Sequence, residues 1–174
     1  MSGGSTDYVI TPDGSFTAPL RLVYPYSRTV GPTYGRFFEA LLEHRIEGTK
    51  NVGGHVFVPP VEFDPATGDA LSQLAVVASV GTVTTWSWQP GPYEGSPLPY
   101  PFAWALIQLD GASTTMLHAV DCGAPEAMRT GMRVVARWAE EPTPGMSSLV
   151  CFDAVASGTP DATSGATTAE GALS

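Results

Sequence analysis

The sequence predicts a mainly β protein in which one helix precedes a small barrel of about five strands. Three observations favour this fold class. The chain of 174 residues contains 19 Gly and 16 Pro, which favours many turns and short strands over long helices. Residues 33–48 carry apolar side chains at helical spacing. About five segments after residue 74 have the alternation or the apolar runs that are typical of strands.

The order of these elements divides the chain into five parts. Residues 1–32 are broken by prolines, so we expect an extended N-terminal arm. Residues 33–48 form the helix, residues 49–73 a short ribbon-like segment, and residues 74–155 the barrel. Residues 156–174 lack aromatic and large β-branched side chains, a composition typical of a flexible tail.

The helix is predicted from a single apolar stripe in "TYGRFFEALLEHRIEG". Thr33 stands where an N-cap is expected, and Gly48 stands where a helix usually ends. The stripe consists of Phe37, Phe38, Leu41, Leu42 and Ile46.

The strands follow from changes in period along residues 74–155. In "LAVVASVGTVTTWSWQP" we expect one strand with a bulge or bend at Gly81, and with Thr84, Trp86 and Trp88 on one face. Asp110-Gly111 between two apolar runs indicates a hairpin. Two further strands are expected at Arg133 to Trp138 and in "SSLVCFDAV". A helix, a ribbon-like segment and about five strands in this order predict a barrel of the OB type.

The charge of the chain limits its partners. The formal net charge is −9, with only 8 Lys and Arg residues. Nucleic-acid affinity depends on clustered cations, so a binding module for single-stranded nucleic acid is the weakest of three functional hypotheses. Without basic partners, Trp86, Trp88 and Trp104 favour core packing or an apolar docking surface.

Targeting signals and cysteine content indicate a cytoplasmic protein. No apolar run approaches the ~20 residues that span a bilayer. The first 15 residues contain neither the basic segment nor the apolar core of a secretory signal. Cys122 and Cys151 are too few for a disulfide framework or a four-thiolate metal site, so we expect reduced thiols.

One histidine is a candidate general base. His118 precedes Asp121 by three residues, but side chains at this spacing point to opposite faces of a strand, which opposes direct pairing. A structural role for His118 is therefore favoured. Cys122 follows an acidic residue, which opposes thiolate formation, and the chain has no G-x-S-x-G motif. We find no nucleophile–base pair.

Several short motifs occur in one recognisable order over residues 33–155. They are "FFEALLEHRIEGTKNVGGHVFVPP", "GTVTTWSW", "PYPFAWALIQLDGA", "MLHAV" and "RTGMRVVARW". In this order the chain resembles the domain of unknown function 35 family, the zinc-ribbon/OB-fold proteins associated with acyl-CoA. The lead-in "YPYSRTVGPTYGRFFEAL" and "MLHAV" make it most similar to members partnered with thiolase-like proteins of the lipid-transfer (SCP-x) type.

The resemblance implies a zinc ribbon with two Cys-x-x-Cys knuckles, yet this chain has lost all four cysteines. The family pattern places Lys50 and Gly53 at the first knuckle, and Asp64 and Thr67 at the second. Tetrahedral zinc requires four such ligands, and a lysine opposes a cation. We therefore expect a degenerate, metal-free ribbon that serves as a docking element.

The resemblance also implies a non-catalytic subunit of a thiolase-like complex. Such a subunit would stabilise its partner and shape an acyl-CoA channel for a retro-aldolase, lyase or acyltransferase that acts on thioesters such as steroid side-chain intermediates. It would bind no cofactor itself, because the CoA thioester is the substrate of the complex. We expect a hetero-oligomer without nucleic acid or membrane, with partner contacts at Tyr24, Tyr26, Phe37, Phe57, Pro59, Pro60 and Tyr100.

An alternative gives this chain a direct catalytic part in acyl-CoA hydration or aldol cleavage, with His118 as the base. The sequence leaves open the acyl group, the identity of the partner, the stoichiometry and whether loop 89–101 contacts ligand.

Overall fold

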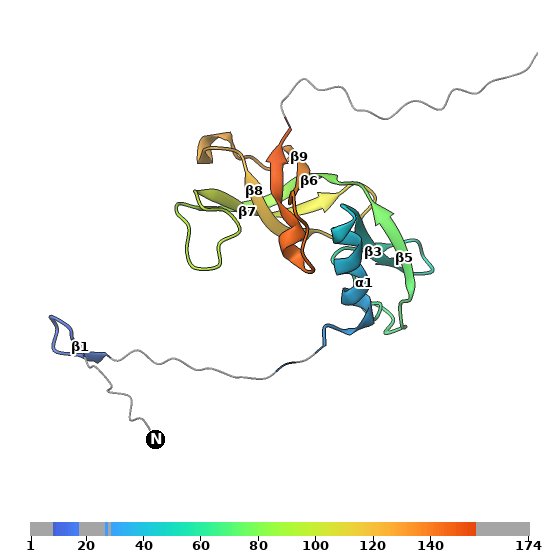
Figure 1. Ribbon diagram of the computed structural model, residues 1–174, viewed down its shortest axis with the longest axis horizontal. Helices are drawn as coiled ribbons and strands as arrows, with labels where there is room; N and C mark the ends of the chain where they lie inside the picture. Colours follow the sequence, from blue (N-terminus) through green and yellow to red (C-terminus); the bar gives the residue numbers. More distant parts are fainter. Residues whose placement is uncertain (1–8, 18–26, 28, 156–174) are drawn as a thin grey trace, which may run out of the picture.

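The computed structural model describes residues 9–17, 27 and 29–155. A helix and a small three-stranded sheet lie beside a five-stranded barrel (Figure 1). The elements that build these parts are α1 (Gly31–Leu42), β3 (Ile46–Lys50), β4 (Val56–Phe57), β5 (Gln73–Val77), β6 (Val80–Gln89), β7 (Phe102–Leu109), β8 (Met116–Asp121), β9 (Arg133–Trp138) and β10 (Leu149–Ala154). Two short 3₁₀ helices, η1 (Pro125–Ala127) and η2 (Met146–Ser148), and a hairpin of β1 (Val9–Ile10) and β2 (Phe16–Thr17) complete the described elements.

The barrel confirms the predicted fold class. Its strands follow the order β10-β8-β7-β6-β9, and the pairing of β9 with β10 closes the ring. Every pair is antiparallel except β8 and β10, which run parallel. The predicted hairpin at Asp110-Gly111 joins β7 to β8, and β9 has the predicted limits. No helix in the described ranges is long and apolar enough to cross a membrane.

One apolar core joins the helix, the small sheet and the barrel. Alternate residues of β7, including Ala105 and Ile107, enter this core together with Phe152 of β10. Phe37 and Leu41 of α1 belong to the same buried cluster. The helix thus buries its apolar face against the rest of the chain, which is the main source of stability for a short helix.

A register shift in β6 changes which tryptophans face the core. Val83 pairs with Ile107 of β7, but Thr85 already pairs with Leu106, so Thr84 is an extra residue. The bulge returns Trp86 and Trp88 to the face of Val83, where both pack against the core. The predicted alternation was wrong at Thr84, and the irregularity lies there rather than at Gly81.

The predicted helix over residues 33–48 was too long. The helix starts at Gly31, with Val30 rather than Thr33 as its N-cap, and Pro32 occupies its first turn. It ends at Leu42, and His44 with φ 56° turns the chain. The residues from Ile46 onward form β3, in which Ile46 is buried opposite Val77. The predicted helix was too long because Ile46 also fits an apolar stripe at helical spacing.

The ribbon-like segment is a sheet in which β3 lies between β4 and β5. β5 pairs with β3 and not with the barrel strands, so this sheet extends past the predicted boundary at residue 74. The Val58–Pro59 peptide bond is cis. Ser113 and Thr114 of the β7–β8 turn accept hydrogen bonds from the amides of Val56 and Val58, which fixes the segment to the barrel.

Candidate functional site

A cavity of about 530 Å³ lies on the side of β7 and β8 that carries Trp104 and Leu117. Its remaining walls are formed by the β6–β7 loop of residues 90–101, the β9–β10 loop of residues 139–148 and the first two residues of β10. We call this cavity the barrel groove. Its lining residues are Gly95, Ser96, Pro97, Trp104, Leu117, His118, Met146, Ser147, Leu149 and Val150.

The groove lies on a second, smaller apolar cluster that is separate from the main core. Leu98, Phe102, Ala119 and Cys151 are buried there, and Trp104 and Val150 pack against them. Leu117 and Met146 remain 59% and 37% exposed. The groove is therefore an apolar surface that is open to solvent and lies on buried apolar residues.

His118 is a buried neutral imidazole in this setting. Its exposed fraction is 6%, and its ring lies edge-on to Phe152 with 5.7 Å between the ring centroids. Its Nδ1 accepts a hydrogen bond of 2.9 Å from the amide of Ala119. Burial lowers the pKa of His118 to about 4. The sequence placed His118 away from Asp121, and the carboxylate of Asp121 indeed binds other side chains.

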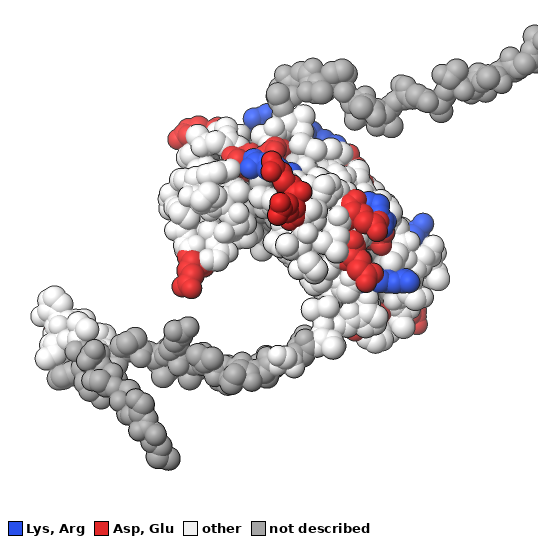
Figure 2. Space-filling model, viewed as in Figure 1, with Lys and Arg blue, Asp and Glu red and all other residues white. Residues whose placement is uncertain are grey.

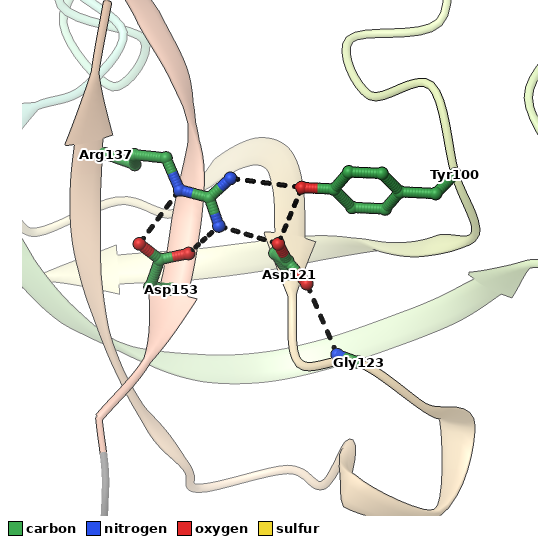
Figure 3. Close-up of polar contacts among 5 residues, drawn as sticks. All are labelled: Tyr100, Asp121, Gly123, Arg137 and Asp153. Atoms are coloured by element: carbon green, nitrogen blue, oxygen red, sulfur yellow. Dashed lines mark hydrogen bonds and ion pairs between the residues drawn. The ribbon is translucent and has the colours of Figure 1, made fainter.

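An ion-pair network joins three strands to the β6–β7 loop (Figure 3). Arg137 of β9 donates to Asp121 of β8 at 2.6 Å and pairs with Asp153 of β10. Tyr100 donates its hydroxyl proton to Asp121 at 2.8 Å and accepts from Arg137 Nη1 at 3.2 Å. Tyr100 thus ties the loop of the groove to the barrel.

The network shifts the pKa values of Asp121 and Arg137. Partial burial alone would raise the pKa of Asp121, but hydrogen bonds from Arg137 and Tyr100 lower it. Hydrogen bonds to Asp153 and Asp121 raise the pKa of Arg137, so its charge is permanent. Sequence reasoning missed Arg137 and Asp153. Their only signal is that each stands on a predicted strand as a charged residue among apolar ones.

Neither cysteine is an activated thiol. Cys151 is fully buried, and burial raises its pKa to about 12. Burial also raises the pKa of Cys122, and the neighbouring charge of Asp121 adds to this shift. Both therefore stay protonated at neutral pH, as their sequence context predicts.

The structure brings together the four positions at which the resemblance implies lost metal ligands. Lys50, Gly53, Asp64 and Thr67 all line one cavity of about 450 Å³ between the turns of the ribbon segment. Asp64 is only 5% exposed, and a hydrogen bond from Asn51 is the main cause that lowers its pKa.

These residues do not fit a zinc ion. Lys50 supplies a positive charge at a ligand position, and the carboxylate of Asp64 already accepts hydrogen bonds from Asn51 and Ala66. In the part of the chain that the structure describes, no three His, Cys, Asp or Glu side chains gather in a way that would hold a metal ion. A metal-free ribbon stays our prediction.

Two of the predicted partner contacts were wrong. Phe37 is 1% exposed and packs in the core, and Pro60 is also buried. The apolar stripe of α1 serves the fold, so Phe37 has no surface to offer. Tyr24 and Tyr26 lie outside the described residues.

The other predicted contacts reach the surface. Phe57 and Pro59 are half-buried beside the ribbon sheet, and Tyr100 is 40% exposed at the end of the β6–β7 loop. Partner binding at these three residues stays a prediction. Sequence reasoning missed Leu117 and Met146, which are exposed apolar residues of the groove.

The closed five-stranded barrel, with a groove framed by its first and last loops, defines an OB-fold domain. Residues 75–139 match the family model described as the C-terminal OB-fold domain of ChsH2. These residues are therefore similar to an OB-fold domain of a protein of this kind, which supports the resemblance to the domain of unknown function 35 (DUF35) family seen in the sequence.

Two solved structures share this fold. One, described as the Ltp2-ChsH2(DUF35) aldolase, matches with a TM-score of 0.55 and 21% identity over 74% of this chain and 97% of that chain. Another, a protein of unknown function from the DUF35 family of Sulfolobus solfataricus, matches with a TM-score of 0.52 and 18% identity over 71% and 84%. No curated protein matches the chain.

Proposed function

We propose that this chain is a non-catalytic subunit of a thiolase-like complex of the SCP-x type that acts on acyl-CoA thioesters. Its partner would perform a retro-aldol cleavage, another lyase reaction or an acyl transfer on substrates such as steroid side-chain thioesters. The observation that carries the proposal is the match to the DUF35 chain of a structure described as an aldolase, which extends over 97% of that chain.

The chemistry of the described side chains supports an accessory role. His118 is buried and neutral, with its pKa lowered to about 4. Burial raises the pKa values of Cys122 and Cys151. A general base for aldol cleavage needs a pKa near the working pH, and a thiol nucleophile needs a lowered one. In this proposal the reacting groups belong to the partner, and this chain stabilises the partner and shapes the acyl-CoA channel.

The groove itself opposes the nucleic-acid hypothesis. Many OB folds bind oligonucleotides between their first and last loops, where the groove of this chain lies. Such sites combine stacking aromatics with cations along the phosphate path. Trp104 could stack on a base, but none of the lining residues is Lys or Arg.

Co-expression tests the proposal directly. The full chain would be produced with each thiolase-like protein of its source organism in turn, and each mixture would be assayed for cleavage of a β-hydroxyacyl-CoA. We expect one pair to form a stable hetero-oligomer whose activity requires both chains. A full chain that remains separate from every such protein would contradict the proposal.

The catalytic alternative rests on the place of His118 in the wall of the groove. His118→Gln in the active complex separates the two functions. An accessory role predicts turnover within a few-fold of the wild type, whereas a general base predicts a loss of about 10²-fold or more. The second result would replace the proposal by the catalytic one.

A further inference from the structure

We infer that the barrel groove is the docking site for apolar side chains carried on a Lys- or Arg-bearing segment of the partner protein, and that it is not the site of the CoA thioester. The inference rests on the proposed function, because it names where the partner of that complex binds.

The walls of the groove favour an apolar occupant. Leu117 and Met146 expose 59% and 37% of their surfaces, and Trp104 and Val150 lie between them and the second apolar cluster. Exposed apolar groups that gather in one concave site mark interaction surfaces rather than ordinary surface. A volume of about 530 Å³ has room for one or more large side chains.

The charges around the groove decide between a polypeptide and CoA. The β6–β7 loop carries Glu94, and the β9–β10 loop carries Glu140 and Glu141, all three exposed. The neighbouring network holds Arg137 between Asp121 and Asp153, so it also has a net negative charge. The visible face has a broad uncharged area with acidic residues near it (Figure 2).

This pattern of charge repels the phosphates of CoA and attracts cations. CoA sites neutralise phosphate groups with Arg, Lys or helix N-termini, and the lining residues of the groove include no Lys or Arg. A partner segment with basic residues beside an apolar side chain complements both features. The net charge of −9 adds long-range attraction for such a segment.

The groove is also held in shape before any partner binds. Leu98 anchors the β6–β7 loop in the second cluster, and Tyr100 ties its end to Asp121. In the β9–β10 loop, Ser148 donates its hydroxyl proton to the carbonyl of Thr143 at 2.6 Å. A preformed site loses little conformational entropy on binding, which favours affinity.

Two substitutions of exposed residues test the inference in the co-expressed complex. Leu117→Glu places a charge in the groove, and Ala127→Glu is its control, because Ala127 is exposed on η1, outside both the groove and the ribbon sheet. We expect Leu117→Glu to raise the dissociation constant at least tenfold and Ala127→Glu to leave it within threefold. Circular dichroism of both variants verifies that they fold.

A charge reversal provides a second, independent test. In Glu94→Lys/Glu141→Lys the acidic loops become basic, whereas Glu126→Lys changes an exposed residue of η1 outside the groove. We expect the double variant to slow association at low salt by tenfold or more, and the control to slow it much less.

The outcomes separate the inference from the proposed function. A complex that forms equally well with Leu117→Glu overturns the docking site and leaves the proposed function intact. Failure of the wild-type chain to form any complex overturns both. Titration of the free full chain with octanoyl-CoA gives a third result. A saturable shift of the Trp104 indole resonance that Leu117→Glu abolishes would assign the groove to the thioester and overturn the inference.

Discussion

Asn51 donates a hydrogen bond of 2.7 Å from its Nδ2 to Oδ2 of Asp64 and so joins the two turns of the ribbon segment. Each partner also closes its own turn. Asn51 Oδ1 accepts from the amide of His55 at 2.9 Å, and Asp64 Oδ1 accepts from the amide of Ala66 at 2.8 Å. A polar pair therefore links the two turns that the sequence resemblance assigns to lost metal-binding knuckles.

The first prediction concerns this pair. We expect Asp64→Ala to lower the urea midpoint and to speed hydrogen exchange at the amides of residues 51–68, because Asn51 and the amide of Ala66 lose their acceptor. Asp69→Ala is the control, since the carboxylate of Asp69 is exposed and accepts its hydrogen bond from the Thr67 side chain within the same turn. Equal effects of both substitutions would contradict the role of the pair.

The same pair has a predictable pH dependence. Because the pKa of Asp64 is lowered in the folded chain, the stabilisation it provides is present above the unfolded pKa of about 3.9. It is lost as the pH falls through the lower folded value. The wild type should therefore lose its advantage over Asp64→Ala in this acidic range, as urea titrations at pH 7 and below pH 4 would show.

Gly48 tests the place of β3 in the sheet. A Cβ at this position would lie 2.5 Å from the carbonyl oxygen of Phe57 and 2.8 Å from the side chain of Val58. We expect Gly48→Ala to cost about 1–3 kcal/mol of unfolding free energy through overpacking. Gly35→Ala in α1 meets no atom within 4 Å and should stabilise by about 0.5–1 kcal/mol. A neutral Gly48→Ala would show that the strands can separate.

His118 should make the fold sensitive to mild acid. Its folded pKa of about 4 lies below the ordinary histidine pKa of 6.5, so the unfolded chain binds a proton more readily between these two pH values. Stability should therefore be highest above pH 6.5 and fall by about 3 kcal/mol as the pH approaches 4. Urea unfolding from pH 7 to 4.5 measures this slope. His118→Gln should flatten it, whereas His55→Asn, at an exposed residue, should not.

Arg137 should contribute to stability more than an exposed arginine does. Arg137→Met leaves Asp121 and Asp153 without their shared cation, and we expect a loss of about 1–2 kcal/mol after allowance for solvent screening. Arg133→Met, which breaks a pair with Asp110 in which both side chains are exposed, should change the free energy of unfolding less. Urea unfolding of both variants makes the comparison, and equal losses would contradict the prediction.

The two thiols should react at different rates. Cys151 has no exposed surface and Cys122 is half-buried, so native protein should release about one equivalent of thionitrobenzoate from Ellman's reagent, and slowly. Both thiols should react at once in denaturant. Cys122→Ser should abolish the native reaction, and rapid labelling of Cys151 in that variant would indicate opening of the second cluster.

The sequence predicted the barrel well because its signals are local. The Asp-Gly turn and the order of the apolar runs each depend on neighbouring residues. The end of α1 was harder to predict, since Ile46 fits a helical stripe and a buried strand alike. Thr84 was missed because a bulge depends on pairing with a strand 22 residues away, at Leu106.

The candidate site was harder to predict from the sequence than the barrel. Trp104, Leu117 and Met146 come from three separate elements, and no spacing in the chain shows that they share one wall. Arg137 and Asp121 are 16 residues apart and meet only because the barrel closes. By contrast, the meeting of Lys50, Gly53, Asp64 and Thr67 could be expected, because the sequence resemblance implies that these positions surround one centre.

The place of β10 has a consequence for synthesis of the chain. β10 lies between β8, with which it runs parallel, and β9, with which it runs antiparallel. The strand translated last is therefore the one that completes the ring. Until residues 149–154 leave the ribosome, the nascent chain presents two unpaired strand edges, on β8 and on β9, that can pair with other chains. A pause in translation before Leu149 would prolong that exposed state.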